Sequence, residues 1–231
     1  MYKIKLLSIL TLTLLVSCFW SWQDTQWENT SERPWERLWE VKERVQIFAL
    51  GDSLTAWYGL PIEDGYPSVL QTLLNEYHWN HKVINAWVSG NTSAELLSRL
   101  DWVLSDAEPW DIAILVIGWN DGLRGMSLWE LESNILSIID TLRQKDIRIV
   151  LWGMQIPPNL WLRYTRDFEV LYKNIARNNR DIYFIDFFLE WVAADSALNL
   201  PDMIHPNSEW YQIIAKNVYN FLITQNLVWS R

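Results

Sequence analysis

From residue 44 onward, short apolar runs alternate with longer amphipathic segments, and this alternation is the main limit on how the chain can fold. Buried parallel strands are expected as short apolar runs rich in β-branched and aromatic residues. Such runs occupy 45–50, 82–88, 111–117, 147–152 and 182–188. Helical patterns occupy 66–77, 93–105, 127–145, 164–178 and 207–225. The alternation predicts a doubly wound α/β domain around a parallel sheet of five strands.

Four polar segments lie where such a sheet binds ligands, beyond the carboxyl ends of its strands. Three of them follow predicted strands, and the fourth directly precedes the last predicted helix. They are 51–54 (GDSL), 89–93 (SGNTS), 118–122 (GWNDG) and 202–207 (DMIHPN). We therefore expect the chemistry of this chain to be carried by these segments.

Ser53, His205 and Asp202 are the candidates for nucleophilic catalysis. A serine hydroxyl is a poor nucleophile unless a base removes its proton. His205 is the histidine that lies within one of the four segments, so it is the candidate base. Asp202 precedes it in the same segment and can accept the second imidazole N–H, which fixes the tautomer. His78 and His81 lie in a polar region and are expected to be surface residues.

Each segment also has a purely structural interpretation. A GDSL string or an Asp-x-x-His pair occurs by chance in many loops, and Asn120-Asp121-Gly122 has the composition of a simple turn. Pro206 and the residues after it are also typical of a helix start. The functional interpretation depends on finding all four segments in this order, each at the end of a predicted element.

Together the four segments resemble the four sequence blocks of the SGNH (GDSL) hydrolase family, and in particular its arylesterase, thioesterase and lysophospholipase branch. The similarity extends from about Phe48 to Leu222 and includes 60–61 (LP), 121–125 (DGLRG) and 154–158 (MQIPP). The resemblance implies a flavodoxin-like, three-layer α/β/α hydrolase domain over 44–231. It also implies hydrolysis of acyl esters or thioesters through an acyl-serine intermediate, without a cofactor.

The resemblance further implies the residues of the site. Ser53, Asp202 and His205 would form the catalytic triad. The oxyanion would be bound by the backbone N–H of Ser53, the backbone N–H of Gly90 and the side-chain amide of Asn120. Glycine at position 90 would let the backbone approach the substrate closely. Two alternatives stay open, a carbohydrate O-deacetylase of the cell envelope and a catalytically inactive lipoprotein that binds a ligand.

Composition excludes several other classes of function. The formal net charge is −9, which argues against a nucleic-acid partner and against a polybasic membrane patch. With a single cysteine the chain cannot form an internal disulfide, and its three histidines do not group with it into a zinc motif. No metal site is therefore expected.

The N-terminus has the pattern of an export signal. Lys3 and Lys5 precede the apolar stretch 6–16, which is too short to span a bilayer comfortably. Residues 15–18 (LVSC) resemble a bacterial lipobox, in which Cys18 would be lipidated and become the first residue of the mature protein. We expect a signal peptide over 1–17, a flexible tether over 18–43 and an exported lipoprotein anchored to a membrane of the bacterial envelope. A plain signal peptide that happens to end near a cysteine is the alternative.

Tryptophan is unusually frequent and glycine unusually rare. The chain has 17 Trp and 8 Gly, where about 16 Gly would be average for this length. In this branch of the family, glycine is common at the positions of Trp57, Trp87, Trp119, Trp152, Trp161, Trp191 and Trp210. The predicted tether contains Trp20, Trp22, Trp27, Trp35 and Trp39, where glycine would suit a flexible segment.

One hypothesis explains both anomalies. Some bacterial lineages read the codon UGA as glycine, and a gene from such a lineage translated with the wrong code would show tryptophan there. A genuinely Trp-rich protein is the alternative. Trp102 is expected to be genuine, while Trp110, Trp129 and Trp229 remain unassigned. We expect the fold to tolerate Trp at these positions, with crowding around Trp57, Trp87 and Trp119.

Overall fold

A computed structural model describes residues 44–55, 61–77, 80–156, 162–186, 200 and 207–229. All of these residues belong to one compact unit, Arg44–Arg231. The predicted triad members Asp202 and His205, the predicted lipidation site Cys18 and the predicted signal peptide and tether lie outside the described residues. In the described part of the chain, no helix is long and apolar enough to cross a membrane.

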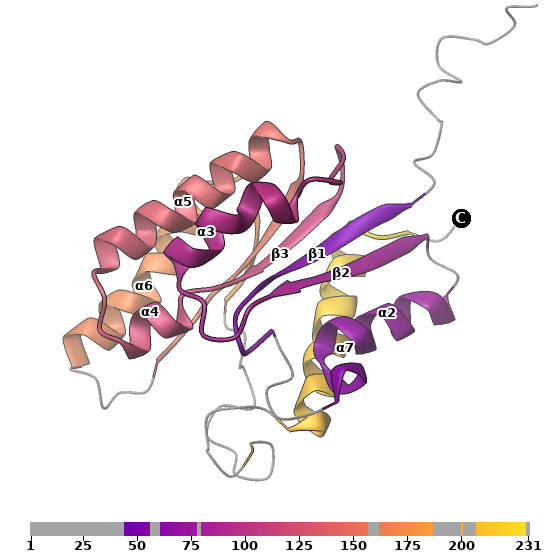
Figure 1. The fold of residues 1–231 in the computed structure, drawn as a ribbon, viewed down its shortest axis with the longest axis horizontal. Coiled ribbons are helices and arrows are strands. Elements are labelled where there is room, and N and C mark those ends of the chain that lie inside the picture. Colours follow the sequence, from indigo (N-terminus) through magenta and orange to yellow (C-terminus); the bar gives the residue numbers. More distant parts are fainter. Residues whose placement is uncertain are drawn as a thin grey trace, which may run out of the picture. The chain divides into compact units, whose positions relative to one another are not determined.

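A parallel sheet of five strands forms the centre of the fold (Figure 1). Its strands are β1 (Val45–Gly51), β2 (His81–Trp87), β3 (Ile112–Val116), β4 (Arg148–Trp152) and β5 (Tyr183–Ile185). Their spatial order is β2-β1-β3-β4-β5, and every neighbouring pair is parallel. This order is that of flavodoxin-like doubly wound sheets, so the predicted fold class is confirmed.

Strand positions follow the apolar runs because the central strands are covered on both faces. Every residue of β3 is buried, and so are all residues of β1 except Gln46. A parallel strand between two helical layers has no polar face, so its sequence is continuously apolar. The edge strand β5 is shorter and only half-buried. The predicted strands therefore match the observed ones to within one or two residues at most ends.

Helices cover both faces of the sheet (Figure 1). On one face α2 packs against α7, and on the other α3 packs against α5, which packs against α6. The helices are α2 (Tyr66–Glu76), α3 (Ser93–Val103), α4 (Trp119–Leu123), α5 (Leu128–Gln144), α6 (Leu162–Asn178) and α7 (Ser208–Thr224), with a short 3-10 helix η2 (Ile62–Asp64). This arrangement confirms the three α/β/α layers.

The amphipathic pattern at 127–145 gives α5 one apolar face, and the helix buries this face. The buried residues of this helix are Leu131, Ile135, Ile138, Ile139 and Leu142. Their spacing places them on one side of a helix with 3.6 residues per turn. Ser133, Ser137 and Asp140, which lie between them, are exposed. The pattern in the sequence was therefore sufficient to orient this helix.

The short helix α4 was not predicted, since its Asn-Asp-Gly sequence has the composition of a turn. Gly118 begins it with φ 106°, a left-handed conformation that glycine adopts readily. A Cβ at this position would also collide with the Tyr172 hydroxyl. That hydroxyl donates to the Ile117 carbonyl at 2.7 Å, so α6 packs directly against the end of β3. A contact 55 positions away in the chain decides this local conformation.

Two further observations differ from the sequence expectations. His81 is only 2% exposed at the start of β2, so the expectation that it lies on the surface is wrong. Burial lowers the pKa of His81 to about 4. Trp110 has φ 71° in the connection that follows α3. A positive φ is a genuine outlier for a bulky residue, and this bears on the unassigned identity of position 110.

The core accommodates several of the questioned tryptophans as large aromatic side chains. Trp152 is 2% exposed and meets the Tyr66 ring edge-on, with ring centroids 6.4 Å apart. Trp210 is 1% exposed in the first turn of α7, and Trp119 is 6% exposed in α4. Trp87 is half-buried at the end of β2. Trp57 lies outside the described residues, so the predicted crowding around it stays a prediction.

Candidate active site

The candidate nucleophile Ser53 lies in a tight turn directly after β1. Within the turn, the Thr55 N–H donates to the Asp52 carbonyl at 3.0 Å, and the Leu54 N–H donates to the Asp52 carboxylate at 3.0 Å. Gly51 is needed before the turn because a Cβ there would come within 2.6 Å of the Val116 carbonyl on β3. Ser53 is 6% exposed. The chain therefore turns sharply after β1 and places Ser53 at the carboxyl edge of the sheet.

Gly90 lies in the turn that follows β2. Its φ is 80°, and the turn is closed by a hydrogen bond from the Asn91 N–H to the Val88 carbonyl at 3.1 Å. Among the described residues, only the Arg124 guanidinium lies near the position a Cβ would occupy, at 3.9 Å. Glycine is therefore favoured here by its backbone conformation rather than by crowding. The Arg124 guanidinium donates to the Gly90 carbonyl at 3.0 Å and links this turn to α4.

Asn120 lies in α4, after β3, and its side chain joins the other two loops. Its amide nitrogen Nδ2 donates to the Asp52 carboxylate at 3.1 Å and to the Asn91 carbonyl at 3.0 Å. Asp52 precedes Ser53 and Asn91 follows Gly90 in the chain. The structure therefore brings Ser53, Gly90 and Asn120, the three predicted oxyanion donors, to one corner of the sheet.

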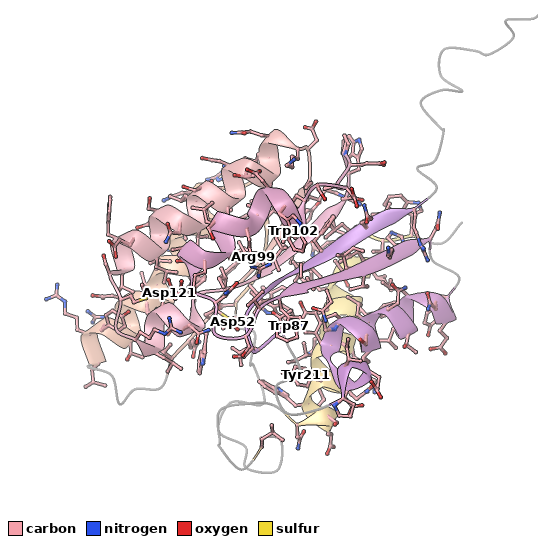
Figure 2. All side chains as sticks on the ribbon, in the orientation of Figure 1. Asp52, Trp87, Arg99, Trp102, Asp121 and Tyr211 are labelled. Atoms are coloured by element: carbon pink, nitrogen blue, oxygen red, sulfur yellow. The ribbon has the colours of Figure 1, made fainter. Side chains whose placement is uncertain are left out.

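Asp52 is a fully buried acid beneath this corner, and its role was not anticipated from the sequence. Figure 2 labels Asp52 between Asp121 of α4 and Tyr211 of α7, and both residues interact with it electrostatically. Burial raises the pKa of Asp52 to about 7, and the negative charge of Asp121 adds to the increase. Hydrogen bonds from the Leu54 N–H and the Asn120 amide oppose it. The carboxylate is thus destabilised by its surroundings but has two donors.

The first turn of α7 lies against the Ser53 turn. Asn207 caps this helix by accepting the Trp210 N–H at 3.0 Å, and the Tyr211 hydroxyl donates to the Ser53 carbonyl at 3.5 Å. Ser208 is also bonded to Asp64 of η2, at 2.8 Å. The predicted base His205 is two positions before the helix cap in the sequence. The segment that carries His205 and Asp202 therefore leads directly into an element that contacts the nucleophile turn.

A second layer of polar contacts supports these loops. The Asp121 carboxylate accepts the Ser93 N–H at 2.9 Å and the Ser93 hydroxyl at 2.6 Å, which joins α4 to the start of α3. The Arg99 guanidinium donates to the Asn91 side chain at 2.8 Å and to the Gly51 carbonyl at 3.4 Å. Sequence reasoning did not identify Arg99 or Asp121 as members of the site. Their only sequence signal is a polar residue placed inside or beside the four segments.

The described residues show no group of three or more His, Cys, Asp or Glu side chains that could hold a metal ion. The described residues bring a serine hydroxyl, backbone N–H groups and a primary amide to this corner of the sheet. Donors of this kind, aimed at one point, can stabilise a developing oxyanion in acyl transfer.

Comparison with known families decides the class of protein. Residues 49–213 match the family described as GDSL-like Lipase/Acylhydrolase. The chain belongs to this family. All three loops described above lie within the matched residues, as do Asp202 and His205.

Relatives and solved structures of the GDSL-like family agree with this assignment. The chain is 33% identical over 178 residues to the arylesterase of Vibrio mimicus, which covers 77% of this chain and 88% of the relative. It is 32% identical over 172 residues to "Thioesterase 1/protease 1/lysophospholipase L1" of Escherichia coli K12, and the match covers 73% of this chain and 79% of the relative. The crystal structure of the psychrotrophic esterase EstA from Pseudoalteromonas sp., inhibited by monoethylphosphonate, matches with a TM-score of 0.74 and 30% identity, covering 78% and 98%.

These matches confirm the SGNH/GDSL resemblance and its arylesterase and thioesterase branch. They also establish the chain as a carboxylic ester hydrolase of this family.

Proposed function

We propose that this GDSL-like hydrolase cleaves acyl esters or thioesters through an acyl-enzyme intermediate on Ser53. The observation that carries the proposal is the convergence of three loops, in which the Asn120 amide is bonded to Asp52 beside Ser53 and to Asn91 beside Gly90. Similarity to an arylesterase and to a thioesterase/lysophospholipase supports the choice of acyl substrate.

In the proposed acylation step, His205 accepts the proton of the Ser53 hydroxyl while Oγ attacks the carbonyl carbon of the ester. Asp202 accepts the second N–H of the imidazole and stabilises its protonated form. The carbonyl oxygen becomes an oxyanion, which the N–H groups of Ser53 and Gly90 and the Asn120 amide bind. As the carbon–oxygen or carbon–sulfur bond to the leaving group breaks, His205 gives its proton to the departing alcohol or thiol.

Deacylation repeats the same steps with water as the nucleophile. His205 removes a proton from water, the hydroxide attacks the acyl carbon, and the oxyanion again occupies the site of the three donors. Collapse of this second intermediate breaks the bond to Ser53 Oγ, which takes the proton back from His205. The products are a carboxylic acid and free enzyme, so the cycle requires no cofactor.

Purified protein assayed on p-nitrophenyl esters of graded acyl length, on a lysophospholipid and on an acetylated sugar tests this function. We expect hydrolysis of the aryl esters, and we expect Ser53→Ala to lower kcat by several orders of magnitude while circular dichroism remains that of the wild type. Selective turnover of the acetylated sugar would instead identify a carbohydrate O-deacetylase. No turnover of any substrate would favour an inactive protein that binds a ligand.

The same proposal includes the location of the enzyme. The apolar stretch 6–16 and the 15–18 segment support export and lipidation of Cys18, with attachment to a membrane of the bacterial envelope. Partition of the mature protein into detergent, and loss of this partition in Cys18→Ser, is the expected result. A mature N-terminus at another residue, found by mass spectrometry, would contradict it.

A further inference from the structure

We propose that Asp52 is a positioning residue that sets the orientation of the Asn120 side-chain amide for oxyanion binding. The inference rests on the function proposed above and assigns a role to a buried acid that the triad and the oxyanion donors leave unexplained. Asp52 is 0% exposed, whereas Asn120 is half-buried at the edge of the site. A buried carboxylate without a function would be costly, since removing a charge from water is unfavourable.

The two oxygens of the Asp52 carboxylate hold two different parts of the site. One accepts the Leu54 N–H at 3.0 Å and so fixes the turn that carries Ser53. The other accepts Nδ2 of Asn120 at 3.1 Å, across 68 positions of sequence. One side chain thereby fixes the distance and angle between the nucleophile turn and the amide of Asn120.

Both N–H groups of the Asn120 amide have acceptors in this structure. One is the Asp52 carboxylate and the other is the Asn91 carbonyl, at 3.0 Å. A primary amide has two donors, so binding an oxyanion requires one of these bonds to be shared or given up. Above its pKa of about 7 the Asp52 side chain is ionised, and hydrogen bonds to an ionised acceptor are about twice as strong as those between neutral groups. We infer that the bond to Asp52 is kept and that the Asn91 carbonyl yields its N–H to the oxyanion.

A carboxylate suits this position better than an amide would. Two donors approach Asp52, from Leu54 and from Asn120, and each has its own oxygen. An asparagine at position 52 has a single oxygen, so its NH2 group would face one of the two donors. If it keeps the local bond to Leu54, it turns its NH2 group toward Asn120 and displaces that amide.

Among the described residues, the charged and titratable groups near Asp52 come from four elements. Asp121 of α4, Tyr172 of α6 and Tyr211 of α7 interact with it electrostatically, and Arg99 of α3 contacts the adjacent Gly51 carbonyl. Tyr172 and Tyr211 remain neutral because burial raises the pKa of each phenol. The Asn120 amide and the Leu54 N–H donate to the Asp52 carboxylate itself.

A double-mutant cycle on the full chain tests the inference, with kcat and KM measured on a p-nitrophenyl ester at about pH 8.5, where Asp52 is ionised. The variants are Asp52→Asn, Asn120→Ala and the pair together. We expect Asn120→Ala to lower kcat by roughly 10²–10³ and Asp52→Asn to lower it by about tenfold or more, each with little change in KM. Because Asp52 acts through Asn120, adding Asp52→Asn to Asn120→Ala should lower kcat by less than about twofold.

Asp52→Ser is the second variant, and it separates the two bonds of the carboxylate. A serine oxygen can still accept the Leu54 N–H two residues on, but it is too short to reach Asn120. We expect it to retain the turn and the melting temperature better than Asp52→Asn does, and to lose a similar factor in kcat. Asp121→Asn is the matched control, a second buried acid whose bonds go to Ser93. The factor by which Asp121→Asn lowers kcat should multiply with the factor by which Asn120→Ala lowers it.

The outcomes distinguish this inference from the proposed function. If the losses from Asp52→Asn and Asn120→Ala multiply, or if Asp52→Ser keeps a wild-type kcat, Asp52 does not act through Asn120. In that case a strong effect of Ser53→Ala and Asn120→Ala would leave the proposed function standing. If neither Ser53→Ala nor Asn120→Ala lowers kcat, the proposed function itself fails.

Discussion

Among single residues, Asp52 makes stability depend on pH. Burial raises its pKa to about 7 from 3.8, so between these values the folded protein binds a proton that the unfolded chain has lost. The free energy of unfolding therefore falls as pH rises through this window. The expected size of the effect, relative to Asp52→Asn, is on the order of 4 kcal/mol between pH 4 and pH 7.5.

Urea denaturation of the wild type and of Asp52→Asn across this range measures the effect. The stability advantage of the wild type over the variant should be greatest near pH 4 and should decline as pH approaches 7.5. A difference that stays constant with pH would show that Asp52 has the same protonation state in the folded and unfolded chains.

Trp110 is the second residue whose local structure has a measurable consequence. Its φ of 71° is a conformation that costs a bulky residue about 1–3 kcal/mol and costs glycine little. The conformation is held by hydrogen bonds from its N–H to the Asp146 carbonyl at 2.9 Å and from the Arg148 guanidinium to its own carbonyl. Trp110→Gly should therefore raise the free energy of unfolding by about 1 kcal/mol.

Trp102→Gly is the matched control, since Trp102 is 79% exposed and lies within α3. Trp102 is the second-last residue of the helix, where glycine is less favourable than tryptophan, so this change should lower the free energy of unfolding by up to about 0.5 kcal/mol. Chemical denaturation of both variants gives the comparison. A loss of similar size in both would mean that position 110 imposes no strain on tryptophan.

At the level of elements, the cap at the start of α7 is expected to affect both the stability of the fold and the position of the proposed base His205. Asn207 caps this helix, and removal of a capping side chain typically costs about 1 kcal/mol. Thr92 caps α3 in a capping box with Glu95, so Thr92→Ala should cost about the same. We expect Asn207→Ala to lower kcat more than Thr92→Ala does, because His205 is two positions from the α7 cap. Equal kcat values in the two variants would show that the α7 cap does not affect catalysis.

The position of a helix or strand could be predicted from the sequence where the residues of that element alone determine its structure. The continuous apolar run of β3 and the single apolar face of α5 are properties of adjacent residues, and both were located correctly. The helix α4 was missed because its start depends on Gly118 packing under Tyr172, which belongs to a distant helix. The role of Asp52 could not be foreseen for the same reason, since its partner Asn120 is 68 positions away. Ser53, Gly90 and Asn120 were accessible because each ends or follows a predicted strand.

For the molecule as a whole, the balance of tryptophan and glycine is open to direct test. Trp152 and Trp210 fill core positions, so the fold tolerates large aromatics there. Trp110 instead has a glycine-like φ, which favours glycine at this position. If UGA is read as glycine in the source organism, codons 57, 87, 152 and 210 should be UGA, while codon 102 should be UGG. UGG at all five codons would contradict the hypothesis.

For the whole molecule, we expect one serine at the carboxyl edge of the sheet to become acylated. Peptide mass spectrometry after reaction with a fluorophosphonate probe identifies the residue that reacts. Activated serines of hydrolases react with such probes, whereas an ordinary hydroxyl does not. We expect a single adduct on the peptide that contains Ser53, and none in folded Ser53→Ala. An adduct on another residue, or an unlabelled wild-type protein that still hydrolyses esters, would contradict it.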